Sequence, residues 1–170
     1  MIDGKPIWEH LLDNKRKEVT SSLDSYHYGK FAEIIGKKFL ESATRREGGL
    51  LKDLFPDINI LSTRRVNMGN KNGDFVIIID CEKDGEFSKK VALFEIKHGK
   101  VCISQNQLRR YCHLIKFPYM LASKADELRV FYLIFSQIML NTISEKVDFS
   151  ICELTKEFAE KISNGKSIKD

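Results

Sequence analysis

An acidic residue and a lysine stand where they could do chemistry at the end of a predicted strand. Glu95 and Lys97 are two residues apart in the apolar stretch from Lys90 to Lys97. Because side chains alternate between the faces of a strand, both would emerge on the same face. An isolated pair of this kind is usually a surface ion pair. Yet a carboxylate and an ammonium on an apolar strand are costly to bury unless they meet each other or a metal ion. The pair alone predicts one of these two arrangements.

A second carboxylate, Asp74, opens the preceding apolar stretch, directly after a glycine-rich turn. The polar, glycine-bearing connection from Glu82 to Glu86 favours a hairpin between the two stretches. In a hairpin the start of one strand lies beside the end of the next, so we expect Asp74 close to Glu95. Their oxygens, with the backbone carbonyl of Ile96, would form a site that a hard divalent cation selects, and a water on that cation could act as nucleophile.

A third acid, Glu33, interrupts the apolar part of a helix predicted from about Tyr28 to Ala43. Gly29 and Gly36 lie on the face beside Glu33, at i−4 and i+3. Their missing side chains would let this helix approach another backbone or a ligand, although each glycine costs about 1 kcal/mol relative to alanine in a helix interior. The alternative is that Glu33 is a solvent-facing glutamate of an amphipathic helix.

Gln107 and Tyr111 lie four residues apart in a helix predicted from Gln105 to about Lys116, with Ser104 as its N-cap. They would therefore offer an amide and a phenol to the same spot. Arg109 and Arg110 would point elsewhere on the helix, where they are suited to phosphate contacts.

These side chains would be positioned by a mixed central β-sheet flanked by helices, so the predicted class is α/β or α+β. The first three strands would form an antiparallel meander. We expect one domain over residues 1–163 and a loose C-terminal tail over residues 164–170. Besides the two helices already given, the periodicity predicts helices from Pro6 to about Leu23 and from about Leu154 to Ile162, and strands at Ile58–Arg65, Asp74–Asp80, Lys90–Lys97, near Val101, at Leu128–Phe135 and at Val147–Cys152.

The charge of the chain is unevenly distributed. The overall formal charge is +4, but the segment from Lys89 to Lys124 has eight Lys and Arg against a single acid, Glu95, which leaves a net charge of −3 for the rest. A basic segment of this kind is typical of phosphate-backbone binding, and a solvated basic face is the alternative.

The four cysteines form no C-x-x-C pair, so a zinc knuckle or a cysteine-ligated cluster is not predicted. No apolar run approaches the roughly 18 residues of a membrane span. We therefore expect a soluble, cytoplasmic protein with no membrane partner.

The motifs together resemble the core of the PD-(D/E)XK nuclease superfamily. The matching elements occur in the family's order over about half of the chain, and the glutamine–tyrosine element is similar to the RecB-like branch. The compact size also resembles archaeal Holliday-junction resolvases and small viral nucleases, which act as dimers. The elements are Gly29-Lys-Phe-Ala-Glu33-Ile-Ile-Gly36, Gly73-Asp74, Glu95-Ile96-Lys97 and Gln107-Leu-Arg-Arg-Tyr111.

The resemblance implies a restriction-endonuclease-like fold and a role for each matching residue. Asp74 and Glu95 would bind Mg²⁺ or Mn²⁺, Glu33 would assist through a water, and Lys97 would orient or activate the attacking water. Gln107 and Tyr111 would position the substrate strand or the lysine. The residues expected to contact DNA are Lys71, His98, Lys100, Arg109 and Arg110.

The chain departs from the family pattern in one respect. The family's Pro-Asp dipeptide is replaced by Gly73-Asp74, whereas a true Pro-Asp occurs earlier, at Pro56-Asp57. We favour Asp74 as the ligand, because proline and aspartate are ordinary loop residues.

The expected function is metal-dependent cleavage of DNA, as an endonuclease or exonuclease in DNA repair or recombination, by a protein that forms a homodimer. Linear ends, single strands, flaps and junctions all remain open as substrates. The alternatives are a junction-specific resolvase, a catalytically inactive DNA-binding or assembly protein on the same fold, and a sugar- or nucleotide-processing enzyme using the same carboxylates.

Overall fold

A five-stranded sheet with its strands in chain order forms the centre of the molecule. The computed structural model describes residues 25–45, 49–67, 73–98, 103–140 and 145–163. Strands β1, β2 and β3 form an antiparallel meander, β4 runs parallel to β3, and β5 is antiparallel to β4. The strands are β1 (Asn59–Val66), β2 (Phe75–Lys83), β3 (Glu86–His98), β4 (Ala125–Leu140) and β5 (Glu145–Glu153).

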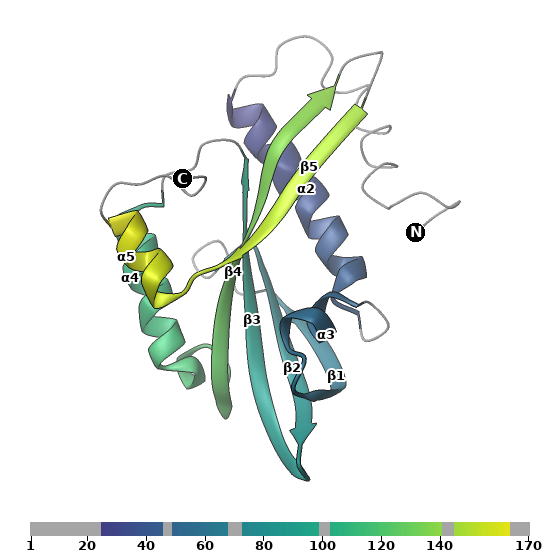
Figure 1. Cartoon of the computed structure of the whole chain (residues 1–170), viewed down its shortest axis with the longest axis vertical. Helices are drawn as coiled ribbons and strands as arrows, with labels where there is room; N and C mark the ends of the chain where they lie inside the picture. Colours follow the sequence, from purple (N-terminus) through teal and green to yellow (C-terminus); the bar gives the residue numbers. More distant parts are fainter. Residues whose placement is uncertain (1–24, 46–48, 68–72, 99–102, 141–144, 164–170) are drawn as a thin grey trace.

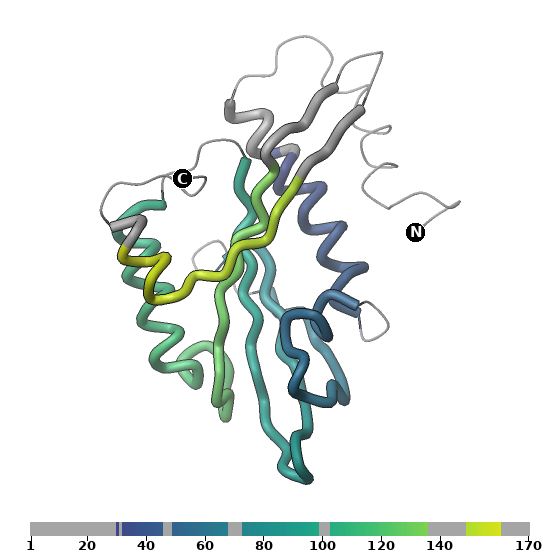
Figure 2. The backbone as a smooth tube through the Cα atoms, viewed as in Figure 1, coloured from purple at the N-terminus to yellow at the C-terminus, as the bar shows by residue number. Residues whose placement is uncertain are grey.

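Helices cover both faces of this sheet (Figure 1). Helices α2 and α3 lie on one face, whereas α4 and α5 lie on the other, and the smooth trace of the backbone shows the same three layers (Figure 2). The mixed α+β class predicted from the sequence is therefore confirmed, and the arrangement is consistent with a restriction-endonuclease-like fold. The helices are α2 (Ser25–Ala43), α3 (Leu50–Leu54), α4 (Gln105–Lys116), the 3₁₀ helix η1 (Pro118–Met120) and α5 (Lys156–Ser163).

Two apolar cores result from the alternation of side chains along the central strands. Phe75, Phe94 and Ile96 face α2 and α3, whereas Val76 and Leu93 face α4 and α5. Because β2, β3 and β4 are covered on both faces, their sequences read as nearly continuous apolar runs rather than as alternating ones. A charged residue that is itself buried in these strands, as Glu95 is, is therefore exceptional.

The turn between β2 and β3 is tighter than the sequence predicted. It consists of Asp84 and Gly85 alone, both with positive φ angles, 52° and 82°, and Lys83 pairs with Glu86. A two-residue turn with positive φ at both positions matches the twist of the flanking strands and suits Asp-Gly. The predicted meander is confirmed, but β2 and β3 extend further into the connection than expected.

Three other predictions need adjustment. The short helix α3, which was not predicted, follows α2 and buries Leu51 in the core that α2 also lines. Strand β4 is longer than predicted at both ends. Helix α5 begins later than expected, where the Thr155 hydroxyl accepts a hydrogen bond from the Phe158 amide at 3.2 Å.

Some predictions lie outside the described residues: the helix from Pro6 to Leu23, the strand near Val101 and the tail over residues 164–170. Across the described ranges, no helix is long and apolar enough to cross a membrane.

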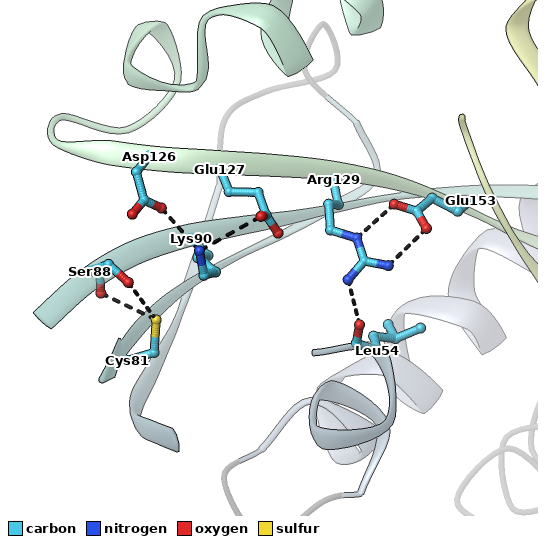
Figure 3. Close-up of polar contacts among 8 residues, drawn as sticks. All are labelled: Leu54, Cys81, Ser88, Lys90, Asp126, Glu127, Arg129 and Glu153. Carbon is cyan, nitrogen blue, oxygen red and sulfur yellow. Dashed lines mark hydrogen bonds and ion pairs between the residues drawn. The ribbon is translucent and has the colours of Figure 1, made fainter. Parts of the chain in front are cut away.

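A clamp around Arg129 ties three elements together on the α2 face of the sheet (Figure 3). Its Nε and Nη2 atoms donate to the two carboxylate oxygens of Glu153 at 2.7 and 2.8 Å, and Nη1 donates to the carbonyl oxygen of Leu54. The guanidinium carbon lies 4.7 Å from the ring centroid of Phe55 and 5.1 Å from that of Phe131. Arg129 thus joins the end of α3 to β4 and β5.

Candidate metal-binding and catalytic site

Asp74 and Glu95 lie directly opposite each other on neighbouring strands. Phe75 pairs with Phe94 in the antiparallel register, and the Asp74 amide donates to the Phe94 carbonyl at 3.1 Å. The Asp74 carboxylate also accepts a hydrogen bond from the Ile96 amide at 2.8 Å. The hairpin therefore brings the two acids together, as the sequence predicted.

The glycine before Asp74 is required by the backbone. Gly73 has a φ of +98°, and an added Cβ would lie 2.7 Å from a methyl carbon of Leu93. Proline fixes φ near −65° and so cannot occupy this position. This constraint accounts for Gly-Asp at a place where the resembled family has Pro-Asp.

The other Pro-Asp dipeptide is remote from this site. Asp57 is exposed and precedes β1, whose first residue, Asn59, pairs with Glu82 next to the β2–β3 turn. That end of the meander is opposite to the end that bears Asp74. The preference for Asp74 over Asp57 therefore agrees with the register.

The carboxylate of Glu95 is buried and engaged by several partners. Its side chain belongs to a residue only 8% exposed. Gln107 Nε2 donates to Oε1 at 3.0 Å, and the Tyr111 hydroxyl donates to Oε2. Lys97 Nζ lies 3.8 Å from Oε1. Because burying an ionised carboxylate is costly, these partners are what allow Glu95 to stand on an apolar strand.

Helix α4 presents both donors because of where it begins. The Ser104 side chain caps the helix by accepting a hydrogen bond from the Gln107 amide at 3.1 Å. Gln107 and Tyr111 share one helix face, as their spacing predicted, and that face turns toward Glu95. Both side chains bind Glu95, and Tyr111 is 0% exposed; their expected role in positioning the substrate strand or Lys97 stays a prediction. Burial, then the negative charge of Glu95, raises the pKa of Tyr111, so its phenol remains a proton donor.

The pKa of Asp74 reflects both its burial and the acidic groups that lie near it. Burial, followed by the negative charge of Glu95, raises its pKa from 3.8 to about 6. Glu33 raises this pKa further, whereas the hydrogen bond from the Ile96 amide and the charge of Lys37 lower it. Negative charge is thus concentrated around Asp74, which is the condition that a divalent cation relieves.

Helix α2 brings Glu33 to the site through a close approach to β3. A Cβ on Gly36 would lie 2.8 to 3.0 Å from three carbons of the Ile96 side chain, so only glycine allows this packing without a shift. Ile96 is the middle residue of Glu95-Ile96-Lys97. The prediction that a glycine lets this helix approach another element is therefore confirmed for Gly36.

Lys37 is a site residue that the sequence reasoning missed. Its ammonium donates to the Glu33 carboxylate at 2.8 Å and its positive charge lowers the pKa of Asp74. Its side chain is about one-third exposed, at 34%. The signal was present in the sequence, because Glu33 and Lys37 have the i, i+4 spacing of a helical ion pair.

The predicted DNA-contacting residues fall into different surroundings. Arg109 is exposed beside the groove between α4 and α5, and His98 is half-buried at the end of β3. Arg110 does not project away from the site as expected, because its guanidinium lies 5.2 Å from the ring centroid of Tyr111. Lys71 and Lys100 lie outside the described residues.

Lys90, one of the basic residues of the segment from Lys89 to Lys124, is paired away from the site. Lys90, in the half of β3 near the turn, pairs with Asp126 at 3.3 Å and with Glu127 at 3.8 Å (Figure 3). Part of the charge that the sequence placed near the site is therefore neutralised elsewhere on the sheet.

The donor set suits a hard cation better than a softer one. In the described part of the chain, no group of three or more His, Cys, Asp or Glu side chains is arranged to hold a metal ion. Asp74 and Glu95 nevertheless supply two carboxylates, and Mg²⁺ commonly uses one or two carboxylates and keeps several waters. These residues fit Mg²⁺ or Mn²⁺ with the Ile96 carbonyl as a third oxygen.

No protein-family model matches the sequence, and no curated protein matches it. The geometry of Asp74, Glu95 and Lys97, together with the motif resemblance, therefore indicates what this site can do. Paired carboxylates beside an ammonium can bind a divalent cation, position a water and balance the charge of a phosphate.

Proposed function

We propose that this chain is a Mg²⁺- or Mn²⁺-dependent deoxyribonuclease of the PD-(D/E)XK type. The observation that carries the proposal is the pairing of Asp74 with Glu95 across the β2–β3 hairpin, with Lys97 Nζ 3.8 Å from Glu95. Each member alone has a structural explanation. Their convergence on the buried end of two apolar strands does not, because such a placement of like charges is destabilising without a cation.

The residues divide the work of phosphodiester hydrolysis. Asp74, Glu95 and the Ile96 carbonyl would hold the cation, which when bound supplies a Lewis acid and a water of lowered pKa. Lys97 would orient the attacking water and offset the negative charge that grows on the phosphate oxygens. The water oxygen bonds to phosphorus, and the bond from phosphorus to one sugar oxygen breaks.

Glu33 and Lys37 on helix α2 also have roles in this proposal. Glu33 would act through a water rather than directly, because its carboxylate already binds Lys37 at 2.8 Å. A DNA phosphate that enters the site could replace Glu33 as the partner of the Lys37 ammonium. The proposal also includes the cytoplasmic location expected from the sequence and the homodimer expected from the resemblance.

The test is cleavage of a panel of labelled DNA substrates: linear duplex, single strand, flap and four-way junction. Cleavage is expected with Mg²⁺ or Mn²⁺ and none with EDTA. Asp74→Asn, Glu95→Gln and Lys97→Ala should each lower the rate by at least about 100-fold, since each removes a group that acts on the reacting phosphate or its metal. Lys89→Ala, near the other end of the same strand, is the matched control and should cut normally.

Two results would refute the nuclease. Salt-dependent DNA binding without cleavage under any of these conditions would identify a binding or assembly protein on this fold. Absence of both cleavage and a salt-dependent affinity for DNA would favour an enzyme of sugar or nucleotide metabolism. The product pattern from an active protein would separate an exonuclease from an endonuclease or a junction resolvase.

A further inference from the structure

The buried polar atoms without a hydrogen-bond partner gather around one carboxylate. Among the described residues, they are Oε1 of Gln107, Nε of Arg110 and the hydroxyl of Tyr132. Gln107 binds Glu95 directly, and Arg110 packs on Tyr111, which also binds Glu95. Unpartnered buried polar groups are rare in folded proteins, so their concentration at one place calls for a functional explanation.

Tyr132 is the least accessible of the three residues. It lies on β4 directly across from Glu95 in the parallel register, on the same face of the sheet, and is 0% exposed. Its ring centroid is 6.5 Å from that of Tyr111 and 6.5 Å from that of Phe158. The side chain is thus enclosed by β3, α4 and α5.

The hydroxyl of Tyr132 has no hydrogen-bond partner among the described residues. A buried hydroxyl without a partner is destabilising, whereas a phenylalanine ring would fill the same space without that cost. Phe131 and Phe135 on the same strand show that β4 accommodates phenylalanine. The hydroxyl therefore needs an acceptor that comes within reach in another state of the site.

Glu95 is the acceptor that fits. The charged and titratable groups that act on Tyr132 are Glu95, Cys112 and Arg110. Burial, then the negative charge of Glu95, raises the pKa of Tyr132, so the phenol is protonated and can donate. Glu95 pairs with Tyr132 in the parallel register, and its carboxylate is a stronger acceptor than the neutral amide oxygen of Gln107, which also has no partner.

We propose that Tyr132 is a positioning residue for Glu95, donating its hydroxyl to the carboxylate when Glu95 turns to bind the cation. Gln107 and Tyr111 both donate to the Glu95 carboxylate in the structure. Turning toward the cation loosens at least one of these bonds, and Tyr132 on the adjacent strand replaces it. The inference rests on the proposed metal-dependent nuclease and adds a residue to its site.

The test compares Tyr132→Phe with wild type in three measurements: thermal unfolding of the metal-free protein, Mn²⁺ affinity by calorimetry, and kcat and KM for DNA cleavage. Metal-free unfolding should occur at the same temperature or higher. The Kd for Mn²⁺ should rise and kcat should fall by about tenfold each, the range usual for partners of metal ligands. The KM for DNA should not change. Tyr119→Phe, which removes a hydroxyl from a residue 60% exposed, is the matched control and should behave as wild type.

The outcomes separate the two proposals. If wild type binds Mn²⁺ and cuts DNA but Tyr132→Phe matches it in Mn²⁺ affinity and kcat, the role of Tyr132 is refuted and the nuclease stands. A loss of activity that accompanies a lower unfolding temperature of the metal-free variant would also refute the role, because it identifies a packing residue. If wild type neither binds Mn²⁺ nor cuts, both proposals fall.

Discussion

The carboxyl of Asp74 links the site to the pH dependence of stability. Its pKa is raised from 3.8 to about 6 by burial and by the charges of Glu95 and Glu33. Between these two values the folded protein holds a proton that the unfolded chain releases. The free energy of unfolding of the metal-free protein should therefore fall as the pH rises from about 4 to about 6, through the contribution of this group.

Asp74→Asn should remove this dependence. Asparagine can still accept the hydrogen bond from the Ile96 amide, but it carries no charge to be repelled by Glu95. We expect the metal-free variant to be more stable than wild type at pH 7 by about 1 kcal/mol, with the difference shrinking toward pH 4. Urea unfolding at several pH values measures this, and curves that stay parallel throughout would contradict the crowding of acids.

Substitution of Tyr111 should lower the free energy of unfolding, whereas Asp74→Asn should raise it at pH 7. Its hydroxyl donates to a buried carboxylate, so Tyr111→Phe leaves one oxygen of Glu95 without its donor. We expect the free energy of unfolding to fall by about 1–3 kcal/mol, the usual cost of an unsatisfied buried group. Tyr119→Phe is again the control in urea unfolding. No loss of stability would mean that the bond to Glu95 is not formed in solution.

At the scale of elements, the sequence predicted the pieces of the site better than their contacts. The hairpin between Asp74 and Glu95 was predictable, because Asp84-Gly85 permits only a short turn and the flanking strands are apolar. The i, i+4 spacing also placed Gln107 and Tyr111 on one face. Which residue that face meets depends on how far α4 is displaced along β3, and no local pattern encodes that distance.

Other features could not be predicted from the sequence, because they also depend on how the elements pack together. Helix α3 is only five residues long and is stabilised by burying Leu51 rather than by its own propensity. The place of Tyr132 beside Glu95 depends on the parallel pairing of β3 with β4, which a crossover through α4 determines. Glu33 was predictable as a candidate, because Gly36 marked a face suited to close packing.

The contact between Gly36 and Ile96 should control how α2 meets the site. Gly36→Ala places a methyl group 2.8 to 3.0 Å from the Ile96 side chain, so α2 or Ile96 must shift. We expect a loss of about 1–3 kcal/mol in stability and a lower cleavage rate, as for other overpacked cores. Measuring both also in the double variant Gly36→Ala with Ile96→Val provides the control.

The smaller valine should restore part of the stability and of the cleavage rate, because it removes the closest contact, that with Cδ1 at 2.8 Å, and leaves only the two Cγ contacts. Gly49→Ala, where nothing lies within 4 Å of the added Cβ, should have little effect. If Gly36→Ala is equally harmless, α2 is not held against β3 in the way described.

At the scale of the whole molecule, the two faces of the sheet bear different groups of polar residues. The face toward α4 and α5 bears Glu95 and its donors, whereas the face toward α2 and α3 bears the Arg129 clamp. The clamp uses a planar group that binds a carboxylate through two nitrogens and packs on two rings, which an ammonium cannot reproduce.

Arg129→Lys should therefore affect stability without affecting chemistry. We expect the free energy of unfolding to fall by about 1–3 kcal/mol, since the bidentate bond and the contact with Leu54 are lost. Mn²⁺ affinity and the cleavage rate per folded molecule should equal those of wild type. An equal loss in Lys90→Ala, whose exposed ion pairs are worth less, would show that the clamp has no special strength.

The order of the strands along the chain has a consequence for newly made protein. Asp74 and Glu95 are joined by a local hairpin that can form as soon as residues 74–98 have left the ribosome, while the side chains that hold Glu95 follow later, from α4 and β4. Domains generally fold as units, and an isolated hairpin is at best marginally stable in water. The acidic pair is therefore held in place only after α4 and β4 have been made, and the proposed DNA cleavage would be among the last properties that translation completes.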